Sequence, residues 1–427
     1  MRILHTSDWH LGRTLEGRAR IQEQRDFLEE LKSIVEREDI HLVLVAGDVF
    51  DTYNPSAEAE ELFYGALEGL AGNGRRAVVV IAGNHDSPDR LHAANPLAER
   101  HGIFLMGYPG ENLFTAETGL DTLEIAAGRD GTDKTGAPVR KVAGGPGWLE
   151  ITVPGCVENA VVAALPYPSE QRLNEVLADS LEDSEMQKAY SGRVFTAFQQ
   201  AAAYFRDDTV NLAVSHLYVL GGLSSDSERE IQLGGAYVVE PAALPANAHY
   251  VALGHLHRPQ KVGGTQVPAR YSGSPLCYSF SEADQQKEVV RVEATPGQDT
   301  VVTPVKLTSG KPMRFLRFDS HEEAYRWCEA VENQNLWVDM EIGSPLPLES
   351  WQVAELRKLH TGIINIRIVL PGPQTVEERD RRLSELSLEE KFNRFAARET
   401  GNAPPRELFE LFIELLEGGE ELETGQA

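Results

Sequence analysis

Five short apolar stretches, each followed at once by polar residues, constrain the fold of this 427-residue chain more than any other feature. Apolar runs of that length are typical of strands that are buried on both faces. Stretches with helical periodicity, from Gln24 to Glu36 and from Leu62 to Leu70, separate the first three runs. Alternating strands and helices predict parallel strands joined by right-handed crossovers, and therefore an α/β fold. The five runs are residues 2–7, 41–46, 77–82, 210–216 and 250–254.

The polar residues after these runs are of the types that bind metal ions. Asp8 and His10 follow the first run, and residues two apart in an extended chain project to the same side, so both can reach one cation. The carboxyl ends of parallel strands share one edge of a sheet, which is where ligands bind. One such residue proves little, but five successive runs end in this way. We therefore expect a single cluster of Asp8, His10, Asp48, Asn84, His85, His216, His255 and His257.

The predicted cluster has the composition of a site for two cations. Histidines, carboxylates and one amide oxygen fill two adjacent coordination shells if one carboxylate is shared, and Asp48 stands alone between the pairs as the natural bridge. Two cations about 3.5–4 Å apart hold a phosphate ester and activate a water molecule for in-line attack. Nitrogen and oxygen ligands without sulfur suit Mn, Fe or Zn. The sequence thus predicts hydrolysis of a phosphoester.

His85 and Asp86 are the candidate catalytic residues. His85 adjoins a predicted ligand and can stabilise the transition state or protonate the leaving oxygen. Asp86 can orient the His85 ring and keep it protonated. The remaining histidines are expected to have structural or surface positions: His5, His41, His92, His101, His249, His321 and His360.

Composition limits the location of the chain and its partners. No run of about 18 apolar residues occurs, and the N-terminus enters a strand directly, so we expect neither a membrane span nor a signal peptide. Three widely spaced cysteines fit the reducing cytoplasm and exclude a thiolate zinc site. The net charge of −26 argues against the simplest nucleic-acid binder. No Gly-x-x-x-x-Gly-Lys-Ser/Thr sequence is present, so ATP hydrolysis would require a partner.

The rest of the chain suggests three domains. Residues 108–155 are expected to form a hairpin or surface insertion, after which residues 160–165 resume the sheet and residues 186–205 form a long helix. The domains are predicted as 1–285 for the catalytic domain, 286–375 for a small α+β domain, and 376–427 for a C-terminal helical segment. Apolar residues at helical spacing in that segment, from Leu383 to Leu416, either pack internally or bind a partner helix.

Five segments of the chain resemble the motifs of the calcineurin-like metallophosphoesterases, and within them the SbcD family of bacterial nuclease subunits. The matching segments are Asp8-Trp9-His10, Gly47–Asp51, Gly83–Asp86, Ser215-His216 and Gly254–His257, and the match spans about residues 1–280. The resemblance implies a β-sandwich flanked by helices, followed by a small α+β capping domain and C-terminal helices. It implies Asp8, His10, Asp48 and His257 around a first ion, Asp48, Asn84, His216 and His255 around a second, and His85 acting on the phosphate.

The resemblance also implies a substrate and partners. It points to a DNA nuclease with two Mn²⁺ ions that dimerises through the nuclease domain. Such a nuclease cuts double-strand ends and hairpins together with an SMC-like ATPase of the SbcC type, which binds the C-terminal helices. Two alternatives stay open: a dimetal phosphoesterase acting on a nucleotide, cyclic nucleotide or phosphoprotein, and a non-catalytic scaffold, which predicts eroded ligands. The complete set from Asp8 to His257 counts against the scaffold.

Overall fold

The computed structural model describes residues 1–112, 138–169, 172, 183–228, 237–369, 392 and 408. The chain divides into two compact units. The first comprises Met1–Ile342 and Leu348–Arg367, and the second comprises Gly343–Pro347 and Ile368–Ala427. The description below concerns the first unit, because the predicted C-terminal segment 376–427 lies almost entirely outside the described residues.

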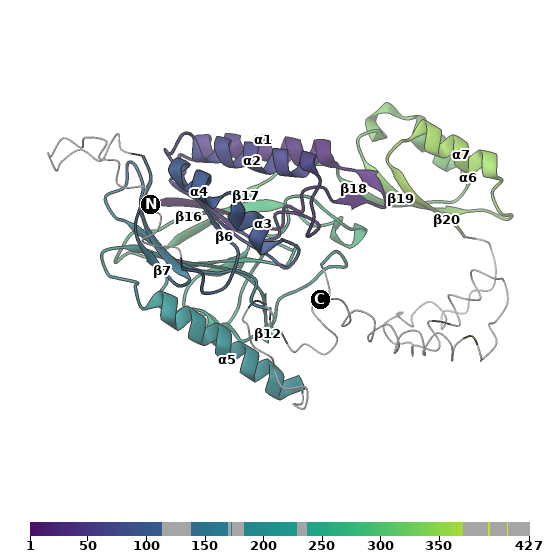
Figure 1. The fold of residues 1–427 in the computed structure, drawn as a ribbon. Coiled ribbons are helices and arrows are strands. Elements are labelled where there is room, and N and C mark those ends of the chain that lie inside the picture. The colour runs from purple at the N-terminus through teal and green to yellow at the C-terminus, as the bar shows by residue number, and fades with distance from the viewer. Residues whose placement is uncertain are drawn as a thin grey trace. The chain divides into compact units, whose positions relative to one another are not determined.

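A six-stranded sheet holds the first three predicted strands side by side and parallel, as the sequence indicates. Its strand order is β17-β16-β1-β4-β5-β6, and the helices α1 (Ile21–Arg37) and α2 (Ala57–Ala71) pack on its outer face (Figure 1). Ser56 caps α2 through its side chain, and Gly72 ends it in the left-handed conformation. The parallel strands are β1 (Arg2–Thr6), β4 (Leu42–Ala46), β5 (Ala77–Ile81) and β6 (Ile103–Met106).

A second sheet, of seven strands, contains the later predicted strands. The prediction that residues 160–165 resume the first sheet is therefore wrong. Its order is β14-β15-β13-β10-β9-β8-β7. Hydrophobic pattern alone does not tell a strand which of two sheets it will join, since both sheets bury both faces. The strands are β7 (Arg140–Gly145), β8 (Trp148–Thr152), β9 (Ala160–Leu165), β10 (Val210–His216), β13 (Tyr250–Gly254), β14 (Gln260–Lys261) and β15 (Ala269–Tyr271).

The two sheets pack face to face and form the predicted sandwich. Leu44 and Val79 of the first sheet share one buried core with Val162 and Leu212 of the second. A separate core lies between the second sheet and α5 (Asp183–Ala202), which contributes Phe198 and corresponds to the predicted helix 186–205. The sandwich and its helices therefore form four layers: helices, sheet, sheet and helix. β7 and β8 pair antiparallel and form a hairpin, whereas residues 113–137 of the predicted insertion 108–155 lie outside the described part of the chain.

The boundary predicted at residue 286 is wrong. β16 (Glu288–Glu293) pairs antiparallel with β1, and β17 (Val301–Lys306) pairs with β16, so residues 288–306 complete the first sheet. Val290 and Val292 are fully buried in the sandwich core, whereas Val289 lies in the core under α1 and α2. The sequence pattern could not predict that this segment pairs with β1, because the two strands are nearly 290 positions apart.

The small α+β domain begins at β18 (Met313–Phe318). Its three-stranded sheet has the order β18-β19-β20, with β19 at Trp337–Gly343 and β20 at Ile363–Val369. The helices α6 (His321–Glu329) and α7 (Ser350–Leu359) complete it. Met313, Trp337 and Ile364 pack against Leu15, so this sheet shares a small apolar core with the catalytic domain.

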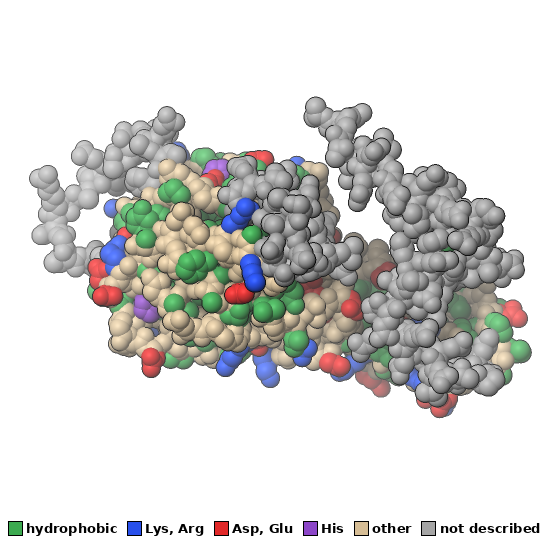
Figure 2. Space-filling model, turned by 90° about the horizontal axis from the view of Figure 1, so that it is seen from below, with side chains coloured by type: hydrophobic (Ala, Val, Ile, Leu, Met, Phe, Trp, Pro, Cys, Tyr) green, Lys and Arg blue, Asp and Glu red, His purple; other side chains and the backbone are tan. Residues whose placement is uncertain are grey.

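Charge is dispersed over the surface that Figure 2 shows. Acidic and basic side chains are both scattered over the described part of this face, among apolar groups. The negative balance of the chain is therefore not gathered there into one acidic patch. Among the described residues, no helix has both the length and the apolar character needed to cross a membrane.

Candidate metal centre

The carboxyl ends of the two sets of parallel strands meet at one edge of the sandwich. His216, the last residue of β10, lies with its Nδ1 2.9 Å from the carbonyl oxygen of Ala46, the last residue of β4. Asp8, His10, Asp48, Asn84, His255 and His257 follow the ends of β1, β4, β5 and β13. The structure thus brings together all seven predicted ligands, which come from both sheets.

The backbone at this edge adopts conformations that side chains usually avoid. Asp8, His10, Asp48 and His255 have φ values of 54°, 44°, 48° and 103°. Each such residue costs about 1–3 kcal/mol and persists only where surrounding contacts enforce it, which is typical of functional sites. Gly83 shows how close the loops approach, because a Cβ there would lie 2.1 Å from Asp48 Oδ1. Only glycine fits at this position.

Asp8, His10 and His257 form the first group of donors. Their ligand atoms lie within 4.8 Å of one another, and all three residues are buried. The Nε2 atoms of His10 and His257 face each other at 3.0 Å. Donors about 2.1 Å from one octahedral cation are about 3 Å apart, so this spacing fits ligands of a shared ion.

Asn84, His216 and His255 form the second group. Asn84 Oδ1 lies 2.9 Å from His216 Nε2 and 3.2 Å from His255 Nδ1, again the spacing of donors in one shell. The Ala46 carbonyl engages Nδ1 of His216, so that Nε2 carries the free lone pair.

Asp48 lies between the two groups. Its Oδ2 is 3.7 Å from His10 Nε2 and 3.3 Å from His216 Nε2, which belong to different groups. Its Oδ1 accepts the backbone N–H of His85 at 2.9 Å. This position between the groups is the one required of a bridging carboxylate.

Without a cation, the charges of the site are balanced by protons. Burial raises the pKa of Asp8 to about 8. Burial opposes a charge on His216 as well, but the carboxylates of Asp48 and Asp8 outweigh it and raise the pKa of His216 to about 9. Burial lowers the pKa of His10 to about 3, so His10 is neutral. A divalent cation held by these residues would replace the protons, since metal ligands must be neutral imidazoles and ionised carboxylates.

Asp86 does not have the predicted task of orienting His85. Its carboxylate accepts the backbone N–H groups of Val49, Phe50 and Gly83, at 3.1, 2.9 and 2.8 Å. The ring of His85 is held instead by the carbonyl oxygen of Asp51, 2.7 Å from Nδ1. A carboxylate next to His85 in sequence was an attractive partner, but the turn directs it back toward the loop after β4.

Two residues that sequence reasoning left without a role support the centre. The Asp51 carboxylate lies 3.5 Å from His10 Nδ1, on the side opposite His257. Arg172 donates to the carbonyl oxygens of Gly83 and Asp86, at 2.6 and 2.7 Å, and so grips the turn that carries Asn84 and His85. Asp51 stands in the quoted segment Gly47–Asp51 and could have been singled out, whereas no sequence signal marks Arg172.

Five of the other histidines make structural contacts. Nδ1 of His5 is 3.0 Å from the hydroxyl of Tyr250 inside the sandwich, and His41 and His249 accept backbone N–H groups. His360 contacts the carbonyl of Asn333, and His92 pairs with Glu111. These contacts agree with the structural positions expected for them.

Comparison with known proteins agrees with this site. The calcineurin-like phosphoesterase family matches residues 1–259. Three similar proteins are each named as the SbcD component of the nuclease SbcCD. The one from Bacillus subtilis is 45% identical over 423 residues, or 99% of each chain. Those from Rhodobacter capsulatus and Escherichia coli K12 are 36% and 30% identical, over 76% and 97% of this chain and 73% and 98% of theirs.

The fold and the paired donor groups define a dimetal phosphoesterase. The chain belongs to the calcineurin-like phosphoesterase family and, within it, to the family of SbcD, a component of the nuclease SbcCD.

Proposed function

We propose that this chain is the nuclease subunit of an SbcCD-type complex and hydrolyses DNA phosphodiester bonds. It acts as an exonuclease on double-strand ends and as an endonuclease on single strands and hairpins, in DNA repair, recombination and replication. The single observation that carries the proposal is the set of seven donors, from Asp8 to His257, assembled around Asp48. The names of the relatives direct this chemistry to DNA.

Asp8, His10, Asp48 and His257 would hold the first cation, and Asp48, Asn84, His216 and His255 the second. Bound there, two divalent ions supply an activated water and neutralise charge on the phosphate. We propose Mn²⁺ for both, as the resemblance to SbcD-type nucleases implies, and the nitrogen and oxygen donors, which would also suit Fe or Zn, are compatible with it.

His85 acts on the phosphate itself. Its Nδ1 is engaged by the Asp51 carbonyl, which leaves Nε2 on the side of the bridging carboxylate, 3.9 Å from Asp48 Oδ2. The chain thereby places His85 Nε2 beside the reacting group, where the ring, in its imidazolium form, can protonate the leaving oxygen. Asp86 contributes indirectly, since its three backbone contacts fix the loops that carry Asp48 and Asn84.

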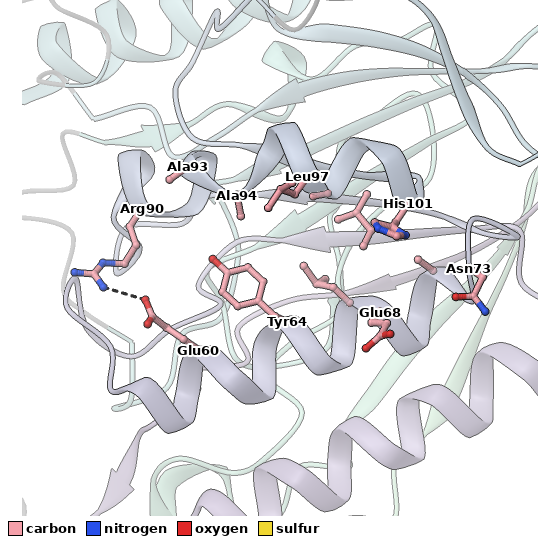
Figure 3. A pocket seen from close by; sticks show the side chains of 13 residues that line it. Glu60, Tyr64, Glu68, Asn73, Arg90, Ala93, Ala94, Leu97 and His101 are labelled. Carbon is pink, nitrogen blue, oxygen red and sulfur yellow. Dashed lines mark hydrogen bonds and ion pairs between the residues drawn. The ribbon is translucent and has the colours of Figure 1, made fainter. Parts of the chain in front are cut away.

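A homodimer through the catalytic domain is part of the proposal. Between α2 and the short helices α3 (Pro88–Ala93) and α4 (Asn95–Ala98) lies a cavity of about 650 Å³, with Leu67 and Leu97 among its apolar residues (Figure 3). Leu97 is 69% exposed, and the Glu60–Arg90 ion pair at 2.9 Å stands at one end. A two-fold axis would place this patch against its own copy. Leu97→Glu should then give a monomer by light scattering, and an unchanged mass would refute this interface.

The proposal extends to the rest of the chain. The small domain from Met313 caps the DNA site, and the C-terminal segment 376–427 binds an SMC-like ATPase of the SbcC type. We also propose a cytoplasmic location, which the free Cys156, Cys277 and Cys328 support.

One observation favours a second function. The net charge of −26 repels a nucleic-acid backbone with its many phosphates. The repulsion is smaller for a substrate with few phosphates, such as a nucleotide or a phosphoprotein loop.

Cleavage of end-labelled linear and hairpin DNA with Mn²⁺ tests the proposal, with and without an SbcC-type ATPase. Cleavage that is lost in Asp48→Asn supports a dimetal nuclease, and stimulation by the ATPase supports the complex. If DNA is not cleaved in either condition while a small chromogenic diester is still hydrolysed, the result would favour the second function.

A further inference from the structure

A series of buried, hydrogen-bonded polar side chains extends away from the metal centre, starting at Nδ1 of His257. While Nε2 of His257 faces His10, its Nδ1 lies 2.5 Å from Ser227 Oγ. Ser227 Oγ lies 2.5 Å from Glu282 Oε1, and Lys287 Nζ lies 2.5 Å from Glu282 Oε2. Ser227, Glu282 and Lys287 are 6%, 0% and 6% exposed. None of these three residues belongs to the donor groups around Asp48.

The direction of each hydrogen bond in this series of side chains follows from the donors available. Glu282 is paired with an ammonium group and is ionised, so it can only accept, and Ser227 must give it the single hydroxyl proton. Another acceptor for that proton, Ser225 Oγ, is more distant, at 3.3 Å, and carries no charge. With its proton committed to Glu282, Ser227 can only accept from His257. The proton on the ring of His257 therefore resides on Nδ1.

We propose that Glu282, acting through Ser227, fixes the tautomer of His257 that presents an unprotonated Nε2 to the first cation. The inference rests on the proposed function, because it assumes that His257 is a metal ligand. Ser227 and Glu282 are positioning residues, since neither touches the cation or the substrate. A ligand held in the correct tautomer and orientation binds its metal more tightly, typically by about 10- to 100-fold.

The same cluster also holds the backbone of His257. Glu228, which follows Ser227, accepts the His257 N–H at 2.7 Å, and Lys287 donates to the His257 carbonyl oxygen at 2.9 Å. Ring, amide and carbonyl of one ligand are thus anchored by two short segments, 225–228 and 282–287. Because the backbone contacts do not involve the Ser227 hydroxyl, removing that hydroxyl isolates its effect on the ring.

Ser227→Ala is the first test, with Ser227→Thr as the rescue. Ser281→Ala is the matched control: Ser281 accepts the N–H of Asp226 at 3.1 Å and so joins the same two segments, but it lies outside the path to His257. Mn²⁺ is titrated into each metal-free full-length chain, and free Mn²⁺ is measured by electron paramagnetic resonance. Ser227→Ala should weaken one of the two Mn²⁺ sites about 10- to 100-fold and leave the other within about threefold. Ser227→Thr restores the hydroxyl, so that variant and the Ser281 control should match the wild type.

Glu282→Gln gives a second, independent reading. The amide of a glutamine can donate to Ser227, which frees the serine proton for His257 Nδ1 and shifts the ring proton to Nε2. Long-range ¹H–¹⁵N spectra of the metal-free chain, labelled with ¹⁵N-histidine, distinguish the two tautomers. A wild-type His257 with its proton on Nε2 would overturn the proposal, as would two unaltered Mn²⁺ affinities in folded Ser227→Ala.

The outcomes separate this inference from the proposed function. The role of Glu282 and Ser227 would stand, and the nuclease would be refuted, if the wild type binds two Mn²⁺ ions, Ser227→Ala weakens one of these sites, and DNA is not cleaved. If DNA is cleaved but Ser227→Ala binds Mn²⁺ as tightly as the wild type, the nuclease would stand and the role of Glu282 and Ser227 would be refuted. A wild-type chain that binds no Mn²⁺ would overturn both.

Discussion

The Asp48 carboxylate joins His85 to the metal centre by using its two oxygens differently: Oδ1 accepts the His85 N–H at 2.9 Å, while Oδ2 lies between His10 and His216. Asp48→Asn separates these two tasks, because its amide oxygen can still accept from His85 but its NH₂ group cannot bind a cation. We expect metal binding to fall from two ions to one or none and hydrolysis to fall at least about 10³-fold. Elemental analysis and circular dichroism check this, and a variant that keeps two ions would contradict the bridge.

His85→Ala should separate catalysis from metal binding. The ring is not needed to hold either cation in the proposed arrangement, so both ions should remain while cleavage falls about 10²- to 10⁴-fold. Single-turnover cleavage of a labelled duplex, with metal content measured on the same sample, gives both quantities. Loss of an ion along with activity would make His85 a ligand instead.

Metal binding should release protons near neutral pH. In the metal-free chain the pKa values of His216 and Asp8 are raised to about 9 and about 8, so near pH 7.5 both groups hold protons that ligation must displace. We expect at least one proton per chain, fewer as the pH rises above about 9, and weaker metal binding as the pH falls. Calorimetric titrations in PIPES and in Tris, which differ in ionisation enthalpy, measure the release. Equal heats in the two buffers would refute it.

Arg172→Ala should loosen the second cation. The lost hydrogen bonds hold the carbonyls on either side of Asn84 and His85, so the Asn84 amide oxygen is positioned less firmly. We expect about a tenfold loss of affinity at one Mn²⁺ site. The ammonium group of lysine carries its three donors on one nitrogen and lacks the planar fork with which Arg172 reaches both carbonyls, so Arg172→Lys should recover only part of the lost affinity. Wild-type affinity in the alanine variant would show that the turn holds itself.

Glu23→Gln should destabilise the contact between α1 and the small domain. Glu23 is bound by Arg20 and accepts the indole N–H of Trp337 at 3.0 Å and the N–H of Lys311 at 2.8 Å. Removing its charge leaves Arg20 without its buried partner, so we expect the free energy of unfolding to fall by about 2 kcal/mol. Urea unfolding measures this, with the exposed Glu29→Gln on the same helix as the unchanged control.

The same variant predicts a pH dependence. Burial opposes ionisation of Glu23, but Arg20 outweighs it and lowers the pKa. A lowered pKa stabilises the fold above the unfolded-state value of about 4.3, and this contribution is lost as the pH falls below it. The difference in stability between Glu23→Gln and wild type should therefore shrink below about pH 4. A difference that stays constant down to about pH 3 would assign the effect to packing.

The donors of the centre could be predicted from sequence because each one follows an apolar strand, and strand ends of parallel sheets converge. Asp8, Asp48 and His216 needed no knowledge of register or of the sheet to which each strand belongs. Residues that act across long separations could not be found in this way. Ser227 and Glu282 are 55 positions apart and follow no strand pattern, and Val290 joins the first sheet only through pairing with β1. Asp86 shows the opposite error, since adjacency suggested a partner that the turn geometry excludes.

The division of the ligands between two distant stretches has a consequence for synthesis. Asp8 to Asn84 emerge early from the ribosome, whereas His216, His255 and His257 lie in the second sheet, more than 130 residues later. In the proposed arrangement, neither stretch alone carries a complete set for either ion. A fragment that ends before His255 should therefore be unable to hydrolyse phosphoesters, so the activity would arise only once both sheets have been synthesised.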